Sequence, residues 1–228
     1  MVVFRADDGG SGPELWATDG TEAGTYMVKD INPAASTGSN PKYLAAMNAK
    51  VYFSDSDGML WASDGTEGGT AIVNSSVSSP LFMTTAGALV FFVAYDGATG
   101  WEIYATDGTE AGTGIVNDIN PGTASSTSID SFVPAGDNMY FLADDGTHGQ
   151  ELWISDGTEA GTRMVKDINP GAASSMIDHN NMEYIDGLLF FGATDGSSGG
   201  ELWVSDGTEA GTIMIEIYPG AMQGYPVT

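Results

Sequence analysis

The sequence contains no cysteine and little positive charge, and each absence excludes a class of protein. Without cysteine the chain has no disulfide bonds and no thiolate metal sites. Only 6 lysines and arginines stand against 31 acidic residues, which gives a net charge of −25 at pH 7. This charge repels phosphates and anionic lipids, so we expect no nucleic-acid partner. It would instead attract cations or simply keep the chain soluble.

Long apolar runs and helical periodicity are missing as well. No run approaches the roughly 18 residues that a membrane helix requires, so we expect no membrane insertion. No signal-peptide layout is visible in residues 1–5, which look like the second half of a repeat. Short segments rich in Val, Ile, Phe, Tyr and Trp alternate with Gly, Asp and Asn, as in residues 43–47, 50–54, 59–63 and 70–74. This rhythm predicts an all-β chain built from meanders.

One heptad, D-G-T-E-(A/G)-G-T, organises the whole sequence. It begins at Asp19, Asp64, Asp107, Asp156 and Asp206, so successive copies lie 45, 43, 49 and 50 residues apart. A period of this size indicates a repeat architecture. Each unit has three tight turns and one long polar connection, which predicts a five-bladed β-propeller of four-stranded blades, a single domain over residues 1–228.

The two ends of the chain predict how this ring closes. Residues 224–228 resemble the start of a first strand, like residues 40–44, and residues 1–6 resemble a second strand. We therefore expect an exchanged strand, in which the C-terminal strand joins the three N-terminal ones. Such closure removes open sheet edges, which otherwise promote aggregation.

The string E-L-W-A-T-D-G-T from Glu14 to Thr21 recurs intact in its E-L-W and D-G-T parts from Glu151 and Glu201. These units resemble the bacterial ELWxxDGT repeat family over essentially the whole chain. The resemblance implies a segment of a large secreted or surface-attached protein, hence an extracellular or cell-surface location, and carries over no catalytic residue. Two copies depart from the pattern: Met59-Leu60-Trp61 follows a turn four residues shorter, and the third copy has Glu102-Ile103-Tyr104.

The heptad itself is expected to be structural, because Asp, Gly and Thr together favour a hydrogen-bonded turn. A ligand role for the heptad is the weaker alternative. The large rings of the repeat are expected to fill the core between blades, with sugar stacking as the alternative. They are Trp16, Trp61, Tyr104, Trp153 and Trp203.

Acidic turns between the second and third strand of each unit are candidates for calcium. Carboxylates beside a glycine on a tight turn supply the hard oxygen ligands that Ca²⁺ prefers, although the spacing is not that of an EF-hand. Solvated turns without metal are the alternative interpretation. The candidate ligands are Asp8, Asp55, Asp57, Asp96, Asp145 and Asp195.

A binding site should use residues that the repeat does not dictate. Tyr95, Trp101 and His148 flank the same type of turn and so are expected on one face, and His179 and Glu183 stand out in the fifth unit. An aromatic ring beside carboxylates suits carbohydrate, whereas Trp101 could instead replace packing lost at Tyr104.

We therefore expect a monomeric, non-catalytic surface module for recognition or adhesion, binding carbohydrate or a cell-surface protein. A lectin-like propeller and a purely structural spacer or assembly unit are alternatives. A glycosidase is the least favoured alternative, because the carboxylates recur in register while catalytic pairs are unlike residues. The G-x-S-x-G string that starts at Gly196 lacks the helix that a hydrolase turn needs.

Overall fold

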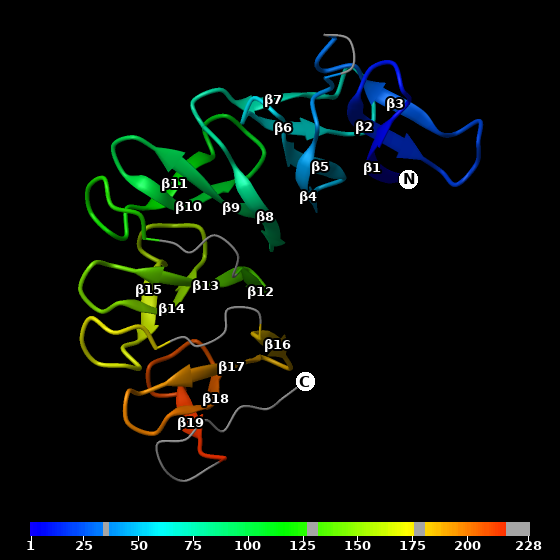
Figure 1. Ribbon diagram of the computed structural model, residues 1–228. Coiled ribbons are helices and arrows are strands. Elements are labelled where there is room, and N and C mark those ends of the chain that lie inside the picture. Colours follow the sequence, from blue (N-terminus) through cyan, green and yellow to red (C-terminus); the bar gives the residue numbers. More distant parts are fainter. Residues whose placement is uncertain (34–36, 127–131, 176–180, 218–228) are drawn as a thin grey trace. The chain divides into compact units, whose positions relative to one another are not determined.

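The computed structural model describes residues 1–33, 37–126, 132–175 and 181–217. These residues form nineteen strands, and the described part of the chain contains no helix, so none that could span a membrane. The strands are grouped into five sheets, four with four strands and one with three, in which neighbours follow chain order (Figure 1). The prediction of an all-β chain built from meanders is confirmed.

We number the five sheets in chain order. Sheet 1 contains β1 (Val2–Asp7), β2 (Pro13–Thr18) and β3 (Tyr26–Lys29), and sheet 2 contains β4 (Lys42–Met47), β5 (Lys50–Ser54), β6 (Leu60–Ser63) and β7 (Ala71–Asn74). Sheet 3 contains β8 (Leu81–Ala86), β9 (Leu89–Asp96), β10 (Gly100–Thr106) and β11 (Thr113–Asn117). Sheet 4 contains β12 (Val133–Ala135), β13 (Asn138–Asp144), β14 (Gln150–Ser155) and β15 (Arg163–Lys166). Sheet 5 contains β16 (Glu183–Ile185), β17 (Leu188–Thr194), β18 (Gly200–Ser205) and β19 (Ile213–Ile215).

The chain divides into two compact units. The first comprises residues 1–95 and 104–114, and the second comprises residues 96–103 and 115–228. Among the described residues, sheet 1 has no strand before β1, and residues 224–228, which were expected to supply one, lie outside them. The exchanged closing strand therefore stays a prediction.

Within each unit, neighbouring sheets bury their faces against each other. In the second unit, Leu142 and Leu152 of sheet 4 share one core with Phe191 and Trp203 of sheet 5. In the first unit, Tyr52 and Leu60 of sheet 2 pack with Phe92 and Tyr104 of sheet 3, and Leu15 of sheet 1 packs with Phe53 of sheet 2. Burial of both faces explains why the central strands carry few charged residues.

The repeated aromatic position contributes to these cores as expected, but not equally. Tyr104, Trp153 and Trp203 are 8%, 9% and 6% exposed, whereas Trp16 and Trp61 are only partly buried. Lysines of the outer strands add a second link between sheets. Lys29 Nζ donates to the Thr70 carbonyl at 2.9 Å, and Lys166 Nζ donates to the Thr212 carbonyl at 2.9 Å.

Candidate functional site

The D-G-T-E turns are held by a closed set of local hydrogen bonds. In the first copy, Asp19 Oδ1 accepts from both the N–H and the hydroxyl of Thr21, at 2.9 and 2.7 Å. The Thr21 hydroxyl accepts from the Gly24 N–H, where a Cβ would overlap the Asp19 carboxylate. The Thr21 hydroxyl bond, followed by the N–H, lowers the pKa of Asp19. The same bonds recur at Asp64, Asp107, Asp156 and Asp206, which accounts for the repeated heptad structurally.

The acidic turns proposed for calcium use their carboxylates in a similar way. Asp8 Oδ1 accepts the N–H groups of Gly10 and Ser11, both at 2.8 Å. Asp195 Oδ1 accepts those of Ser197 and Ser198, at 2.8 and 2.7 Å, and the Ser198 bond is the largest cause that lowers its pKa to about 2. Asp96 Oδ1 accepts the Ala98 N–H at 2.8 Å. Each carboxylate therefore has a role in its own turn.

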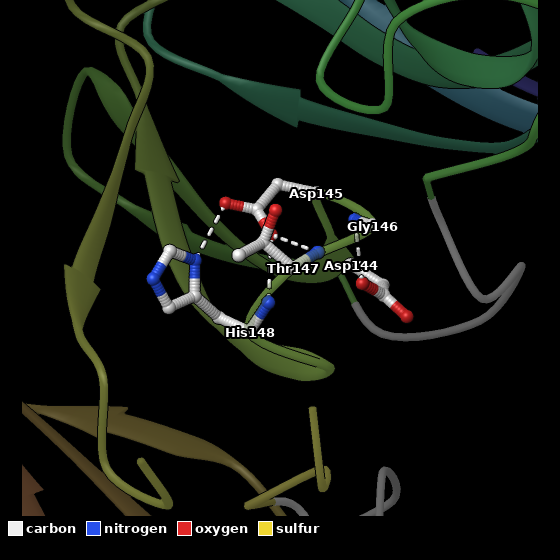
Figure 2. A network of polar contacts seen from close by, with 5 residues as sticks. All are labelled: Asp144, Asp145, Gly146, Thr147 and His148. Atoms are coloured by element: carbon white, nitrogen blue, oxygen red, sulfur yellow. Dashed lines mark hydrogen bonds and ion pairs between the residues drawn. The ribbon is translucent and has the colours of Figure 1, made fainter. Parts of the chain in front are cut away.

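Asp145 makes the most elaborate of these turns, which also holds His148 (Figure 2). Asp145 Oδ1 accepts the N–H groups of Thr147 and His148, both at 2.9 Å, and Oδ2 lies 2.8 Å from His148 Nδ1. The bond to Asp145 raises the pKa of His148. Although burial raises the pKa of Asp145, the bonds from His148 outweigh it and hold this pKa below the ordinary value. The imidazole is thus oriented by its own turn rather than by a second site residue.

Within the described ranges, no three acidic or histidine side chains gather as a group that could hold a metal ion. Calcium binding at the acidic turns stays a prediction.

The residues predicted to bind a ligand are distributed over the chain. Tyr95, 47% exposed, is the next-to-last residue of β9 and belongs to the first unit, while Trp101 lies on β10 in the second. His148 lies in the β13–β14 turn and exposed Glu183 begins β16. His179 lies outside the described residues. The Trp101 backbone is bonded to the following connection, its N–H to the Ser125 hydroxyl at 3.0 Å and its carbonyl to the Ser126 N–H at 3.1 Å.

The role of the glutamate that begins the E-L-W string was not predicted from the sequence. Glu14, Glu102, Glu151 and Glu201 are fully buried. Glu102 accepts the N–H groups of Ile119 and Ser126, at 3.2 and 3.0 Å, as well as the Ser126 hydroxyl. Burial raises the pKa of Glu102 to about 7 against these bonds. Glu14 binds Ser39 in the same way.

In the four sheets that have it, this glutamate binds the connection that follows its own sheet. A signal for this was present in the sequence, because the one sheet without the glutamate also lacks a connection of this type. Sheets 1, 3 and 4 have the glutamate and the string D-I-N-P, from Asp30, Asp118 and Asp167, and sheet 5 has Glu201 and the variant string E-I-Y-P from Glu216. Sheet 2 has Met59 at the glutamate position and no D-I-N-P string.

Two cavities flank a turn of sheet 2. The β5–β6 turn is short, and its Asp55 accepts the N–H groups of Asp57 and Met59, at 3.0 and 2.8 Å, and the indole N–H of Trp61 at 2.7 Å. One cavity of about 280 Å³ lies on the Trp61 side of this turn, lined also by Asn32. Another of about 240 Å³ shares Asp55, Ser56 and Asp57 and is lined on its far side by Lys42, Tyr43, Ser79, Pro80 and Leu81. Of the predicted residues, these cavities bring together only Asp55 and Asp57.

No protein-family model matches the sequence, and no curated protein matches it. Solved structures do resemble the chain. The computationally designed Ika8 protein matches with a TM-score of 0.50 and 15% identity over 97% of this chain and 60% of its own. Oligopeptidase B from Leishmania major matches with a TM-score of 0.53 and 14% identity, over 95% of this chain and 31% of its own. A prolyl endopeptidase matches with a TM-score of 0.52 and 13% identity, over 93% of this chain and 33% of its own.

The chain therefore spans less than two thirds of each of these proteins. At such identities the likeness concerns the fold alone and leaves activity open. Together with the successive meander sheets, it identifies the architecture as that of a β-propeller with five sheets.

Proposed function

We propose that the chain is a five-bladed propeller closed by an exchanged strand and that it serves as a non-catalytic recognition module. Membership of the ELWxxDGT family and an extracellular or surface location belong to this proposal. Sheet 1 supports closure, because its described residues form three strands where the other sheets have four, and residues 224–228 would supply the fourth. Deleting these five residues should lower the melting temperature sharply, while an unchanged melt would exclude closure by this strand.

The recognition role rests on one observation: cavities flank the β5–β6 turn, where the repeat departs from its pattern. Elsewhere the repeated polar residues bind their own turns and connections. The buried glutamates illustrate this, since Glu102 and Glu151 accept backbone N–H groups of the following connection. A carboxylate engaged in this way is a structural element rather than a general acid with access to substrate.

The test is a screen of the full chain against arrays of glycans and of surface proteins, followed by calorimetric titration of each positive. Saturable binding to a defined probe is the expected result. Binding to no probe on either array would contradict the recognition role and favour a structural spacer.

A further inference from the structure

The cavity beside Trp61 exists because the β5–β6 turn is short. In sheet 4 the paired strands continue through Ala143 opposite Glu151 and Asp144 opposite Gln150, whereas in sheet 2 they stop at Ser54 opposite Leu60. In the second unit, the longer turn of sheet 5 covers the connection that precedes it. A Cβ on Gly196 would lie only 2.5 Å from Asn169 Oδ1. In the first unit, Asn32 occupies the position that Asn169 has in the second. The β5–β6 turn is too short to cover Asn32, and a cavity of about 280 Å³ lies there instead.

The walls of this cavity combine an aromatic ring with hydrogen-bonding groups. Trp61, Ile31, Ile72 and Met59 supply the apolar part. Ser56 and Asp57, both exposed, stand with Asn32 at the polar part. The indole is oriented by its N–H bond to Asp55 Oδ2 at 2.7 Å, so its position does not depend on a ligand. An oriented ring next to hydroxyl and carboxylate groups is suited to a ligand with one apolar face and a polar rim.

Charge and size narrow the class of ligand. Lys29 Nζ lies 5.9 Å from the centroid of the Trp61 ring, so a cationic ligand would meet a like charge at this aromatic ring. An anionic ligand would meet Asp57 and a chain with a net charge of −25. Pockets for drug-sized ligands start at about 300 Å³, so this cavity suits a smaller molecule. A neutral, ring-sized, polyhydroxylated ligand satisfies these conditions.

We propose that this cavity binds one neutral saccharide ring, packed against the Trp61 side chain and held by hydroxyl hydrogen bonds to Asp57 and Ser56. The inference rests on the proposed recognition role and names its ligand class and its site. The proposed carbohydrate site therefore lies at the short β5–β6 turn of sheet 2, and not at Trp101, which was the expectation from the sequence. Specificity then comes from the one turn that differs, while the repeated turns provide the scaffold.

The test is saturation-transfer NMR with the full chain and the methyl glycosides of glucose, galactose, mannose and N-acetylglucosamine. At least one glycoside should bind, with the strongest transfer to ring C–H protons of one face. Asp57→Asn should weaken this binding about tenfold, because a carboxylate acceptor is lost at an exposed position that the fold does not use. Trp61→Phe should weaken it by a similar factor. The matched controls Asp8→Asn and Trp153→Phe, at turns and rings of other sheets, should leave it unchanged.

A turn graft provides a variant that does not depend on losing a core ring. Residues 55–58 are replaced by the sequence of residues 143–150, which restores the long turn and leaves Met59 in place. The graft should fold, with a melting temperature lowered by no more than about 4 °C because the Asp55 acceptor is lost, and show no transfer. Transfer that persists in the graft and in Asp57→Asn would overturn the site while leaving recognition intact. If no glycoside binds but a protein on the array does, the ligand class is overturned. If nothing binds on the arrays as well, both proposals are overturned.

Discussion

Sheets 2 and 4 have the same strand order, and each contains a D-G-T-E turn. They differ in how they bind the connection that follows them. In sheet 4 the buried carboxylate of Glu151 accepts the N–H groups of Ile168 and Asn169, at 3.1 and 3.3 Å. In sheet 2 the corresponding residue is Met59, so this connection has no buried carboxylate acceptor. Both sheets bind the following connection through the backbone, from the Ser79 N–H to the Gly58 carbonyl at 2.9 Å in sheet 2 and from the Ser175 N–H to the Gln150 carbonyl at 3.1 Å in sheet 4. Sheet 4 therefore adds a charged side-chain acceptor to a backbone contact that both sheets have.

The same two sheets also differ in how they treat the repeated indole. The indole N–H groups of Trp16, Trp153 and Trp203 are buried, and no acceptor is found for them among the described residues. Trp61 alone of these four donates its N–H, to Asp55. The short turn that opens the cavity therefore also supplies the acceptor that orients the ring at its wall.

Removing the polar fastening of sheet 4 should have the largest effect on stability. Glu151→Ala leaves two backbone N–H groups without their acceptor in a buried position, at a cost of about 4 kcal/mol in the free energy of unfolding. Urea denaturation followed by circular dichroism measures this. Glu159→Ala, at an exposed position of the next turn, is the control and should cost less than about 0.5 kcal/mol. A similar cost for both variants would contradict the fastening role.

The pH dependence of stability should separate the buried glutamates from the turn aspartates. Burial raises the folded-state pKa of Glu102 from 4.5 to about 7 and raises that of Glu151 as well. The folded state then holds protons that the unfolded state has lost, so the free energy of unfolding falls as the pH rises from about 4.5 to 7. Glu102 alone contributes up to about 3 kcal/mol to this fall.

The aspartates have the opposite sign. Turn hydrogen bonds lower the pKa of Asp19, Asp156 and Asp195, so their contribution is present above the ordinary pKa of 3.8 and is lost as the pH falls below it. Stability should therefore be highest near about pH 5. Urea midpoints from pH 3 to 8 test this, and Glu102→Gln should flatten the fall between pH 5 and 7. A maximum above pH 7 would contradict the raised pKa values.

The strand pattern was predictable because each strand is bounded by glycine, aspartate or asparagine turns. Expected and observed strands agree within two residues, as at residues 50–54, which form β5, and 59–63, of which Leu60–Ser63 forms β6. The D-G-T-E turn was equally accessible, since its hydrogen bonds join residues at most a few positions apart. Local chemistry was sufficient for both.

The candidate site was harder to predict because it depends on what other sheets contain. The role of Glu151 involves Ser175, 24 residues later, and no local pattern announces that contact. The cavity at Trp61 results from four residues that sheet 2 does not have, and a missing residue leaves no side chain in the sequence to mark the site. The short turn is visible in the sequence, but the carbohydrate hypothesis was attached to Trp101.

Placing a glutamate in sheet 2 tests whether the buried glutamate and the D-I-N-P connection stabilise the fold only in combination. Met59→Glu puts a carboxylate where no D-I-N-P connection follows, and it should cost about 2 kcal/mol in the free energy of unfolding at pH 7. Replacing residues 74–78 with residues 166–175 in the same variant should recover most of that cost. No recovery, measured by the same urea titration, would show that the two elements are independent. Met59→Gln is the matched control for the charge itself.

The smallest effect should come from the acceptor of the Trp61 indole. Asp55→Ala removes a carboxylate that accepts the N–H groups of Asp57 and Met59 and the indole N–H, at a cost of about 1 kcal/mol because the turn is partly exposed. Asp96→Ala, which removes the acceptor of one turn N–H, is the control. In a spectrum of the tryptophan indole N–H groups, Asp55→Ala should move one signal upfield and leave those of Trp16, Trp153 and Trp203 in place. A charged acceptor deshields the proton of its donor, so the signal that moves is that of Trp61. Its movement would show that the short turn orients this ring. If no indole signal moves, the turn does not orient it.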